Sequence, residues 1–365
     1  MKIRFFERDL SWLSFNHRVL QEASDISVPL LERIKFLAIF SSNLEEYYRV
    51  RVANYYRLAQ IEKKESPAKL SSADDPEILI EKINRIVDKQ QQEFGRIFYE
   101  EIIPALRKDN VIIIQRTSSL NGKQLKKLRK IYKELVAPHL ELMELNDDSE
   151  VPFLINTQVY FLIRVLIDDN IRYFFCRLPV DESGRFIDLK RNTKQFVIQI
   201  DDVIRHFLSE EIGGAINCYA IKVTRDAELY LDEEFEGSMV DRIKRSLLKR
   251  ETGSFTRMLY DESMPDDAIK FLRNYFSLKK RNLVKGGRYH NFYDFFSFPK
   301  IEKPHLYYKE LPQLEHVDIE NSTSIKELIL KKDVLLHYPY HKFDYAVQFV
   351  KQAIEDSSTK HIYIS

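Results

Sequence analysis

Residues 158–178 run Gln158-Val-Tyr-Phe-Leu-Ile-Arg-Val-Leu-Ile-Asp-Asp-Asn-Ile-Arg-Tyr-Phe-Phe-Cys-Arg-Leu178. Gln158–Ile167 and Ile171–Leu178 are rich in β-branched and aromatic residues, which favour strands. Between them, Asp168-Asp-Asn170 is typical of a tight turn. The stretch therefore predicts an antiparallel β-hairpin.

Runs of similar composition lie on both sides of this hairpin. We predict further strands at Val111–Ile114, Phe196–Ile200, Tyr219–Val223 and Ser254–Tyr260. A helical spacing of apolar residues predicts helices at Lys123–Leu135, Val203–Glu210, Phe235–Arg250 and Asp266–Phe276. Strands and helices mixed in this order indicate an α+β domain.

The residues before Asn110 are predicted to form a helical domain. Helices are expected from Ser11, as a cap, and from Pro29, in a first turn. Ser41-Ser-Asn43 is interpreted as a break that caps a third helix from Leu44 to about Lys64. A long helix is expected from Pro76 to about Asp109, bent or interrupted at Pro104.

A third piece follows the α+β region. Phe343–Glu355 has a helical pattern, and Lys360–Ser365 alternates like the start of a strand. Because a lone strand needs a sheet to pair with, we expect the chain to be part of something longer. The predicted fold is multi-domain α+β, with a helical domain at 1–108, a mixed α/β domain at 109–315 and the start of another domain at 316–365.

The composition excludes several classes of protein. Lys and Arg number 57 against 56 Asp and Glu, a net charge of +1, which disfavours a nucleic-acid wrapper and makes any anion site a local patch. The only cysteines, Cys176 and Cys218, exclude a disulfide scaffold and are interpreted as buried apolar residues. We find no membrane-spanning run and no signal peptide, and we expect a cytoplasmic location.

Lys279–His290 is the most unusual segment chemically. It carries five Lys or Arg and no acid, and its Gly286-Gly287 pair allows backbone amides to approach a ligand. Guanidinium groups and amides are what a phosphate needs, although a solvated basic loop with a glycine turn is an alternative. A second basic stretch, Lys123–Lys133, is interpreted as the solvated face of a helix. No nucleotide-binding, hydrolase or metalloprotease motif is present, and the histidines have no clear metal spacing.

Six ordered blocks carry a resemblance to a known family. They are Asp9-Leu-Ser-Trp-Leu-Ser-Phe-Asn16, Arg18-Val-Leu-Gln-Glu-Ala23, Ser42-Asn-Leu-Glu-Glu-Tyr-Tyr-Arg-Val-Arg51, Thr224-Arg-Asp-Ala-Glu228, Gly286-Gly-Arg-Tyr-His-Asn-Phe292 and Asp333-Val-Leu-Leu-His-Tyr-Pro-Tyr-His341. In this order they resemble the N-terminal half of the long bacterial, histidine-phosphorylated polyphosphate kinases.

The resemblance implies an activity and an organisation. The family transfers the γ-phosphate of ATP reversibly to a histidine and then to polyphosphate, with Mg²⁺. Its members have an N-terminal domain, a head domain used in dimerisation and two phospholipase-D-like domains, of which this chain would contain the first two and the start of the third. The chain has no His-x-Lys sequence. We therefore expect the phosphorylated histidine, the second catalytic histidine and the magnesium-associated arginines beyond Ser365, and none of these groups in this chain.

The resemblance also implies site residues. Asn43 matches the asparagine that contacts ATP in the family, a role compatible with the expected cap, and Arg49 and Arg51 are weaker candidates. A phosphate or polyphosphate path is assigned to the basic segment, at Lys285, Gly286, Gly287, Arg288 and His290.

The expected partners are ATP or ADP, polyphosphate and a second copy of the chain in a homodimer or higher oligomer. Neither nucleic acid nor a membrane span is expected, and the location is the cytoplasm, with peripheral membrane attachment allowed. The alternative is a stand-alone module that dimerises or binds polyphosphate without catalysis. A nucleic-acid binder is disfavoured by the net charge of +1 and by the lack of a recognition motif.

Overall fold

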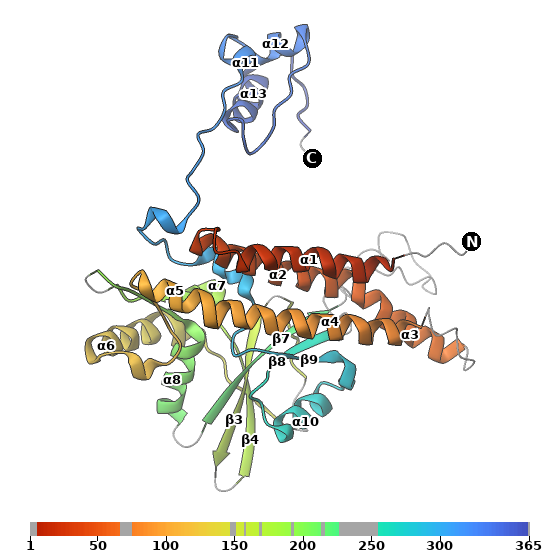
Figure 1. Ribbon diagram of the computed structural model, residues 1–365, viewed down its shortest axis with the longest axis vertical. Coiled ribbons are helices and arrows are strands. Elements are labelled where there is room, and N and C mark those ends of the chain that lie inside the picture. The colour runs from red at the N-terminus through yellow and green to blue at the C-terminus, as the bar shows by residue number, and fades with distance from the viewer. Residues whose placement is uncertain are drawn as a thin grey trace. The chain divides into compact units, whose positions relative to one another are not determined.

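The computed structural model describes residues 6–65, 75–146, 151–156, 158–167, 170–190, 193–212, 216–225 and 255–363. The chain forms two compact units, Met1–Tyr307 and Tyr308–Ser365. Figure 1 shows a helical layer and a mixed α/β part within the first unit. The predicted α+β class, with helices first and sheets after them, is confirmed.

The helical layer consists of five helices. They are α1 (Arg8–Ser24), α2 (Leu30–Glu46), α3 (Ala53–Glu65), α4 (Pro76–Arg96) and α5 (Ile103–Lys108). A π-helical turn, Tyr47–Val52, joins α2 to α3, and another, Ile97–Ile102, joins α4 to α5. α1, α2 and α4 pack together and run side by side in Figure 1. The predicted helical region is confirmed.

Two local predictions in this layer are wrong. Ser11 does not cap α1, since the Glu7 carboxylate accepts the hydrogen bond from the Leu10 amide at 2.6 Å. Ser41–Asn43 do not interrupt the helix. They lie inside α2, which continues through the π-helical turn into α3. Asn43 is therefore not a cap. The interruption predicted near Pro104 is confirmed, because the π-helical turn Ile97–Ile102 separates α4 from α5 just before this proline.

Two sheets form the α/β part. The smaller has the order β1 (Val111–Ile114), β6 (Gln195–Gln199), β5 (Phe186–Asp188). The larger has the order β2 (Met143–Leu145), β4 (Asn170–Arg177), β3 (Val159–Ile167), β7 (Ile216–Arg225), β8 (Phe255–Asp261), β9 (Leu283–Gly286). The predicted hairpin is confirmed as β3 and β4, which pair antiparallel. All predicted strands within these sheets are confirmed, while the short β2, β5 and β9 escaped prediction.

The larger sheet is covered by helices on both faces, as Figure 1 shows. Phe161 and Ile163 of β3 pack with α6 (Gly122–Ile131) and α8 (Ile200–Ile212), whereas Tyr160 and Leu162 belong to the core with α10 (Asp266–Tyr275). This alternation follows the two-residue period of a strand. The predicted helices are confirmed here, except that Phe235–Arg250 lies outside the described residues.

Shorter elements complete the first unit. They are α7 (Val180–Ser183), a π-helical turn at Tyr132–Val136 and 3₁₀ turns at Thr117–Ser119, Ala137–His139, Lys280–Asn282, Phe292–Ser297 and Pro304–Leu306. The chain after β9 returns to the helical layer. There, the ring of Phe292 packs edge-to-face against Phe98 of the π-helical turn Ile97–Ile102, with ring centroids 5.0 Å apart. The basic segment is thereby brought next to α2.

The second unit is small and helical. It contains α11 (Val317–Glu320), α12 (Ile325–Lys331) and α13 (Asp344–Glu355) around Ile319, Ile325 and Tyr345. The predicted helix at Phe343–Glu355 is confirmed. Lys360–Tyr363 is not a strand, since no strand lies in the described part of this unit for it to pair with. Among the described helices of the whole chain, none is long and apolar enough to cross a bilayer.

Candidate functional site

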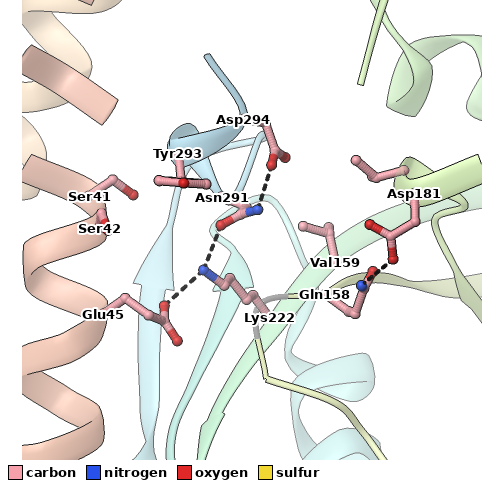
Figure 2. Close-up of a pocket in the computed structure, with 11 residues that line it drawn as sticks. Ser41, Ser42, Glu45, Gln158, Val159, Asp181, Lys222, Asn291, Tyr293 and Asp294 are labelled. Carbon is pink, nitrogen blue, oxygen red and sulfur yellow. Dashed lines mark hydrogen bonds and ion pairs between the residues drawn. The ribbon is translucent and has the colours of Figure 1, made fainter. Parts of the chain in front are cut away.

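A pocket of about 420 Å³ lies between the helical layer and the larger sheet. Figure 2 shows α2 on one side of it and the segment after β9 above it. It is lined by Ser41, Ser42, Glu45, Gln158, Val159, Val180, Asp181, Lys222, Asn291, Tyr293 and Asp294. The structure thus brings together the block at Ser42–Arg51 and the block at Gly286–Phe292, which lie far apart in the sequence.

Lys222 of β7 is the central charge of this pocket. Its Nζ lies 2.8 Å from Glu45 Oε2 and donates to Asn291 Oδ1 at 2.9 Å, as Figure 2 shows. Thr224 donates to the other Glu45 oxygen at 2.8 Å. Although burial disfavours the charged form, the ammonium of Lys222 holds the pKa of Glu45 below its usual range. Glu45 and Lys222 therefore form a buried, charged pair.

Asn43 lies on a different face of α2 from this pair. Its side-chain amide donates to Asn16 Oδ1 of α1 at 3.1 Å, and Asn16 in turn donates to the Phe40 carbonyl at 3.2 Å. Asn43 does not line the pocket. Its side chain is held by a neighbouring helix rather than by a helix end, and it is partly exposed.

The two arginines of the π-helical turn already have acidic partners. Arg51 contacts the buried Asp9 with Nε at 2.9 Å and Nη2 at 3.2 Å, in a two-pronged arrangement. Arg49 pairs with Glu46 at 2.5 Å on the exposed side of the helix. Tyr55 also donates to Asp9. The ion pair of Asp9 and Arg51 therefore connects α1 to the π-helical turn, and Arg51 has a structural role.

The basic segment is divided between exposed and paired residues. Lys285 and Gly287 are exposed. Arg288 pairs with Asp202 of α8 at 2.6 Å, and Tyr289 donates to the same carboxylate at 2.5 Å. Burial raises the pKa of Asp202, and Arg205 and Arg288 oppose that shift. The charge of Arg288 is thus largely matched by an acid within the protein.

His290 is buried, and its Nε2 lies 3.0 Å from the Gly287 carbonyl. Among the described residues, none forms a hydrogen bond with its Nδ1. Burial, together with the charge of Lys222, lowers the pKa of His290 to about 3. The imidazole is neutral at neutral pH and cannot act as a cation for phosphate in this arrangement.

Gly286 has a packing role that the sequence does not reveal. A Cβ at this position would lie 2.8 Å from Leu259 Cγ, whereas one at Gly287 would meet nothing within 4 Å. We predict that Gly286→Ala lowers the free energy of unfolding by about 1–3 kcal/mol through overpacking, measured by urea denaturation. Gly287→Ala is the matched control, with an expected change below about 0.5 kcal/mol. Equal effects at both positions would contradict this assignment.

The cysteines and the candidate metal ligands show no sign of reactivity or of metal binding among the described residues. Burial raises the pKa of the Cys176 thiol to about 12 and that of Cys218 to about 11, so both are protonated at neutral pH. Cys176 is buried, as predicted, whereas Cys218 is only partly buried. Among the described residues, no group of three or more His, Cys, Asp or Glu could hold a metal ion.

Several polar residues of the site escaped prediction. They are Glu45, Lys222, Asn291, Asp294 and Arg185, the last of which contacts Asp201 and the His290 carbonyl, both at 3.0 Å. One usable signal was present, because Lys222 is the only charged residue within the apolar run Tyr219–Val223. A lone charge in such a strand indicates a buried partner.

Comparison with known proteins identifies the family. The chain matches the polyphosphate kinase N-terminal domain over residues 5–114, the middle domain over residues 123–298 and C-terminal domain 1 over residues 324–365. The chain belongs to the polyphosphate kinase family. The resemblance inferred from the six sequence blocks is thereby confirmed, including the correspondence with the N-terminal half.

Individual relatives of this family agree. The polyphosphate kinases of Vibrio cholerae and Escherichia coli are each 35% identical to the chain over 99% of its length, which is 52% and 53% of their own length. A crystal structure of polyphosphate kinase from Porphyromonas gingivalis superposes with a TM-score of 0.78 at 30% identity, covering 98% of this chain and 50% of that one. The chain spans about half the length of the curated relatives it matches.

Proposed function

We propose that the chain is the N-terminal portion of an ATP:polyphosphate phosphotransferase, which moves the γ-phosphate of ATP reversibly to a histidine and then to polyphosphate. The observation that carries the proposal is the match of three successive polyphosphate kinase domains, in order, along one chain. The nucleophilic histidine and the Mg²⁺ ligands are assigned to the half of the relatives that this chain does not cover. This portion alone is proposed to be inactive.

Within the portion, we assign nucleotide contact to residues 1–108, dimerisation to residues 109–315 and the start of a catalytic domain to residues 316–365. Asn43 is the proposed ATP contact, supported by its partly exposed amide. Phosphoryl transfer depends mainly on positioning and on charge stabilisation, and an amide that orients the nucleotide serves the first need.

The phosphate path is assigned to residues that differ in their accessibility. Among the residues assigned to it, Lys285, Gly287 and Arg288 are exposed, and Arg288 is paired with Asp202. Lys285 and Gly287 are therefore the preferred contacts for polyphosphate. Arg49, Arg51 and Arg288 would have to leave acidic partners first, and His290 would have to leave the interior. The protein is proposed to act in the cytoplasm as a homodimer or higher oligomer.

The test compares the full-length gene product with this 365-residue chain. We expect ATP-dependent polyphosphate synthesis and an acid-labile phosphoprotein from the full-length product, and neither from the chain alone. Radiolabelled ATP with acid and base stability of the trapped label reports both. Synthesis or a phosphohistidine on the chain alone would contradict the placement of the nucleophile. Absence of both from the full-length product would contradict the proposed function itself.

A further inference from the structure

A buried ion pair joins α2 to β7, two residues beyond Asn43. The side chains of Glu45 and Lys222 are 15% and 6% exposed, and their charged atoms lie 2.8 Å apart. Every other partner of the pair comes from the sheet side: Thr224 of β7 binds Glu45, and Asn291 of the segment after β9 binds Lys222. Three distant segments of the chain therefore meet at one pair of charges.

The hydrogen bonds and the ion pair of Glu45 and Lys222 depend on direction, whereas the apolar packing around them does not. Leu44 and Phe40 of α2 belong to an apolar core, where burial stabilises the helix without selecting one register strongly. Glu45 has both carboxylate oxygens engaged at 2.8 Å, and Lys222 is bound by two acceptors. A small rotation or slide of α2 would leave buried charges without partners, which is costly.

The pair also lies apart from Asn43 itself. Glu45 faces β7 and the pocket, as Figure 2 shows, whereas the Asn43 amide donates to Asn16 of α1. Within the described part of the chain, neither Glu45 nor Lys222 forms a hydrogen bond or an ion pair with Asn43. Any influence of the pair on a nucleotide at Asn43 must therefore pass through the position of α2.

We propose that Glu45 and Lys222 are positioning residues, which set the register of α2 on β7 and thereby the place of Asn43 relative to the rest of the site. The proposal rests on the proposed function, since it concerns the same nucleotide contact. Through Lys222, the mixed α/β domain would influence the nucleotide site without contacting the nucleotide. Displacements near 1 Å are enough to weaken the alignment of a bound substrate.

The experiment uses the full-length gene product and the neutral double variant Glu45→Gln with Lys222→Met. Because this variant removes both charges of the pair at once, we expect its melting temperature to stay close to that of the unmodified protein. We expect its KM for ATP to rise about tenfold, with a smaller change in kcat. A purely structural role of the pair would leave KM unchanged. A KM within about twofold of the unmodified value, in a folded variant, would overturn the proposal.

Two further variants separate the possible outcomes. Glu32→Gln makes the same chemical change on the same helix, at a residue paired with Lys35 at 3.0 Å, and should leave KM for ATP unchanged. Asn43→Ala tests the nucleotide contact directly. If Asn43→Ala does not raise KM for ATP, the assignment of Asn43 fails, whatever the double variant does. If Asn43→Ala raises KM and the double variant does not, only the positioning role fails.

Discussion

Replacing Arg185 by methionine is expected to lower the free energy of unfolding by about 3–5 kcal/mol, because it leaves a carboxylate buried without its partner. Arg185 lies between Gly184 and the first residue of β5, and its side chain is 1% exposed. Its Nη2 lies 3.0 Å from Asp201, a completely buried residue at the start of α8. The second Asp201 oxygen has no hydrogen-bond partner in the described part of the chain. The ion pair with Arg185 therefore supplies the neutralising charge.

Arg185 also connects the smaller sheet to the segment after β9. Its Nη2 donates to the His290 carbonyl at 3.0 Å, and its Nη1 lies 3.6 Å from Asp294. Burial raises the pKa of Asp294, and the charges of Arg185 and Lys222 oppose that shift. Loss of Arg185 would therefore disturb two carboxylates and the backbone beside the pocket.

The measurement is urea denaturation of Arg185→Met against Arg177→Met. Arg177 pairs with Glu182 at 2.5 Å on the surface, where such a pair contributes about 1 kcal/mol or less. Adding Asp201→Asn to Arg185→Met should recover part of the loss, because the uncompensated charge is then removed. A loss below about 1 kcal/mol in Arg185→Met would refute the structural role of this ion pair.

Composition and periodicity were sufficient to predict the hairpin, the other long strands and most helices. These elements are long enough for their apolar pattern to be unambiguous, as in Val159–Ile167. The strands β5 and β9, of three and four residues, are too short and too mixed in composition to show a pattern, whereas the equally short β1 is wholly apolar. Their position depends on pairing with β6 and β8, which is a tertiary effect.

The prediction of a helix break at Ser41–Asn43 was wrong for a related reason. Serine and asparagine favour helix ends because their side chains can bind free backbone amides. Within α2 these side chains have other surroundings, with Ser41 and Ser42 lining the pocket and Asn43 bonded to Asn16. Local propensity was overridden by partners that only the folded chain supplies.

The polar part of the site was the least predictable. Glu45 and Arg185 belong to residue types that are mostly exposed, so sequence alone gives both of them a surface role. For Lys222, the only signal is its place as a lone charge in the apolar run Tyr219–Val223, which indicates a buried partner but does not identify it. In β7 the alternation places Lys222 and Thr224 opposite the apolar Ile221 and Val223, on a face that would be solvated in a simple sheet. The helical layer covers this face, and that contact is absent from the strand's own pattern.

His290 should make the stability of the protein depend on pH well above the range in which carboxylates titrate. Burial lowers its pKa in the folded chain to about 3 from an ordinary value of 6.5. Below pH 6.5 the unfolded chain therefore binds a proton that the folded chain does not. Stability contributed by the neutral, buried imidazole is complete above 6.5 and is lost as the pH falls toward 3. The expected loss between pH 7.5 and pH 5 is about 2 kcal/mol.

Urea denaturation of the 365-residue chain across this pH range measures the effect. Glu45, whose pKa is lowered from 4.5, titrates at lower pH and contributes little in this window. His290→Gln keeps a side-chain donor for the Gly287 carbonyl but does not titrate, so it should remove most of the slope. His361→Gln, at an exposed position, should leave the slope unchanged. An unaltered slope in His290→Gln would mean that His290 is not buried in its neutral form, and it would reopen a role for this histidine in binding phosphate.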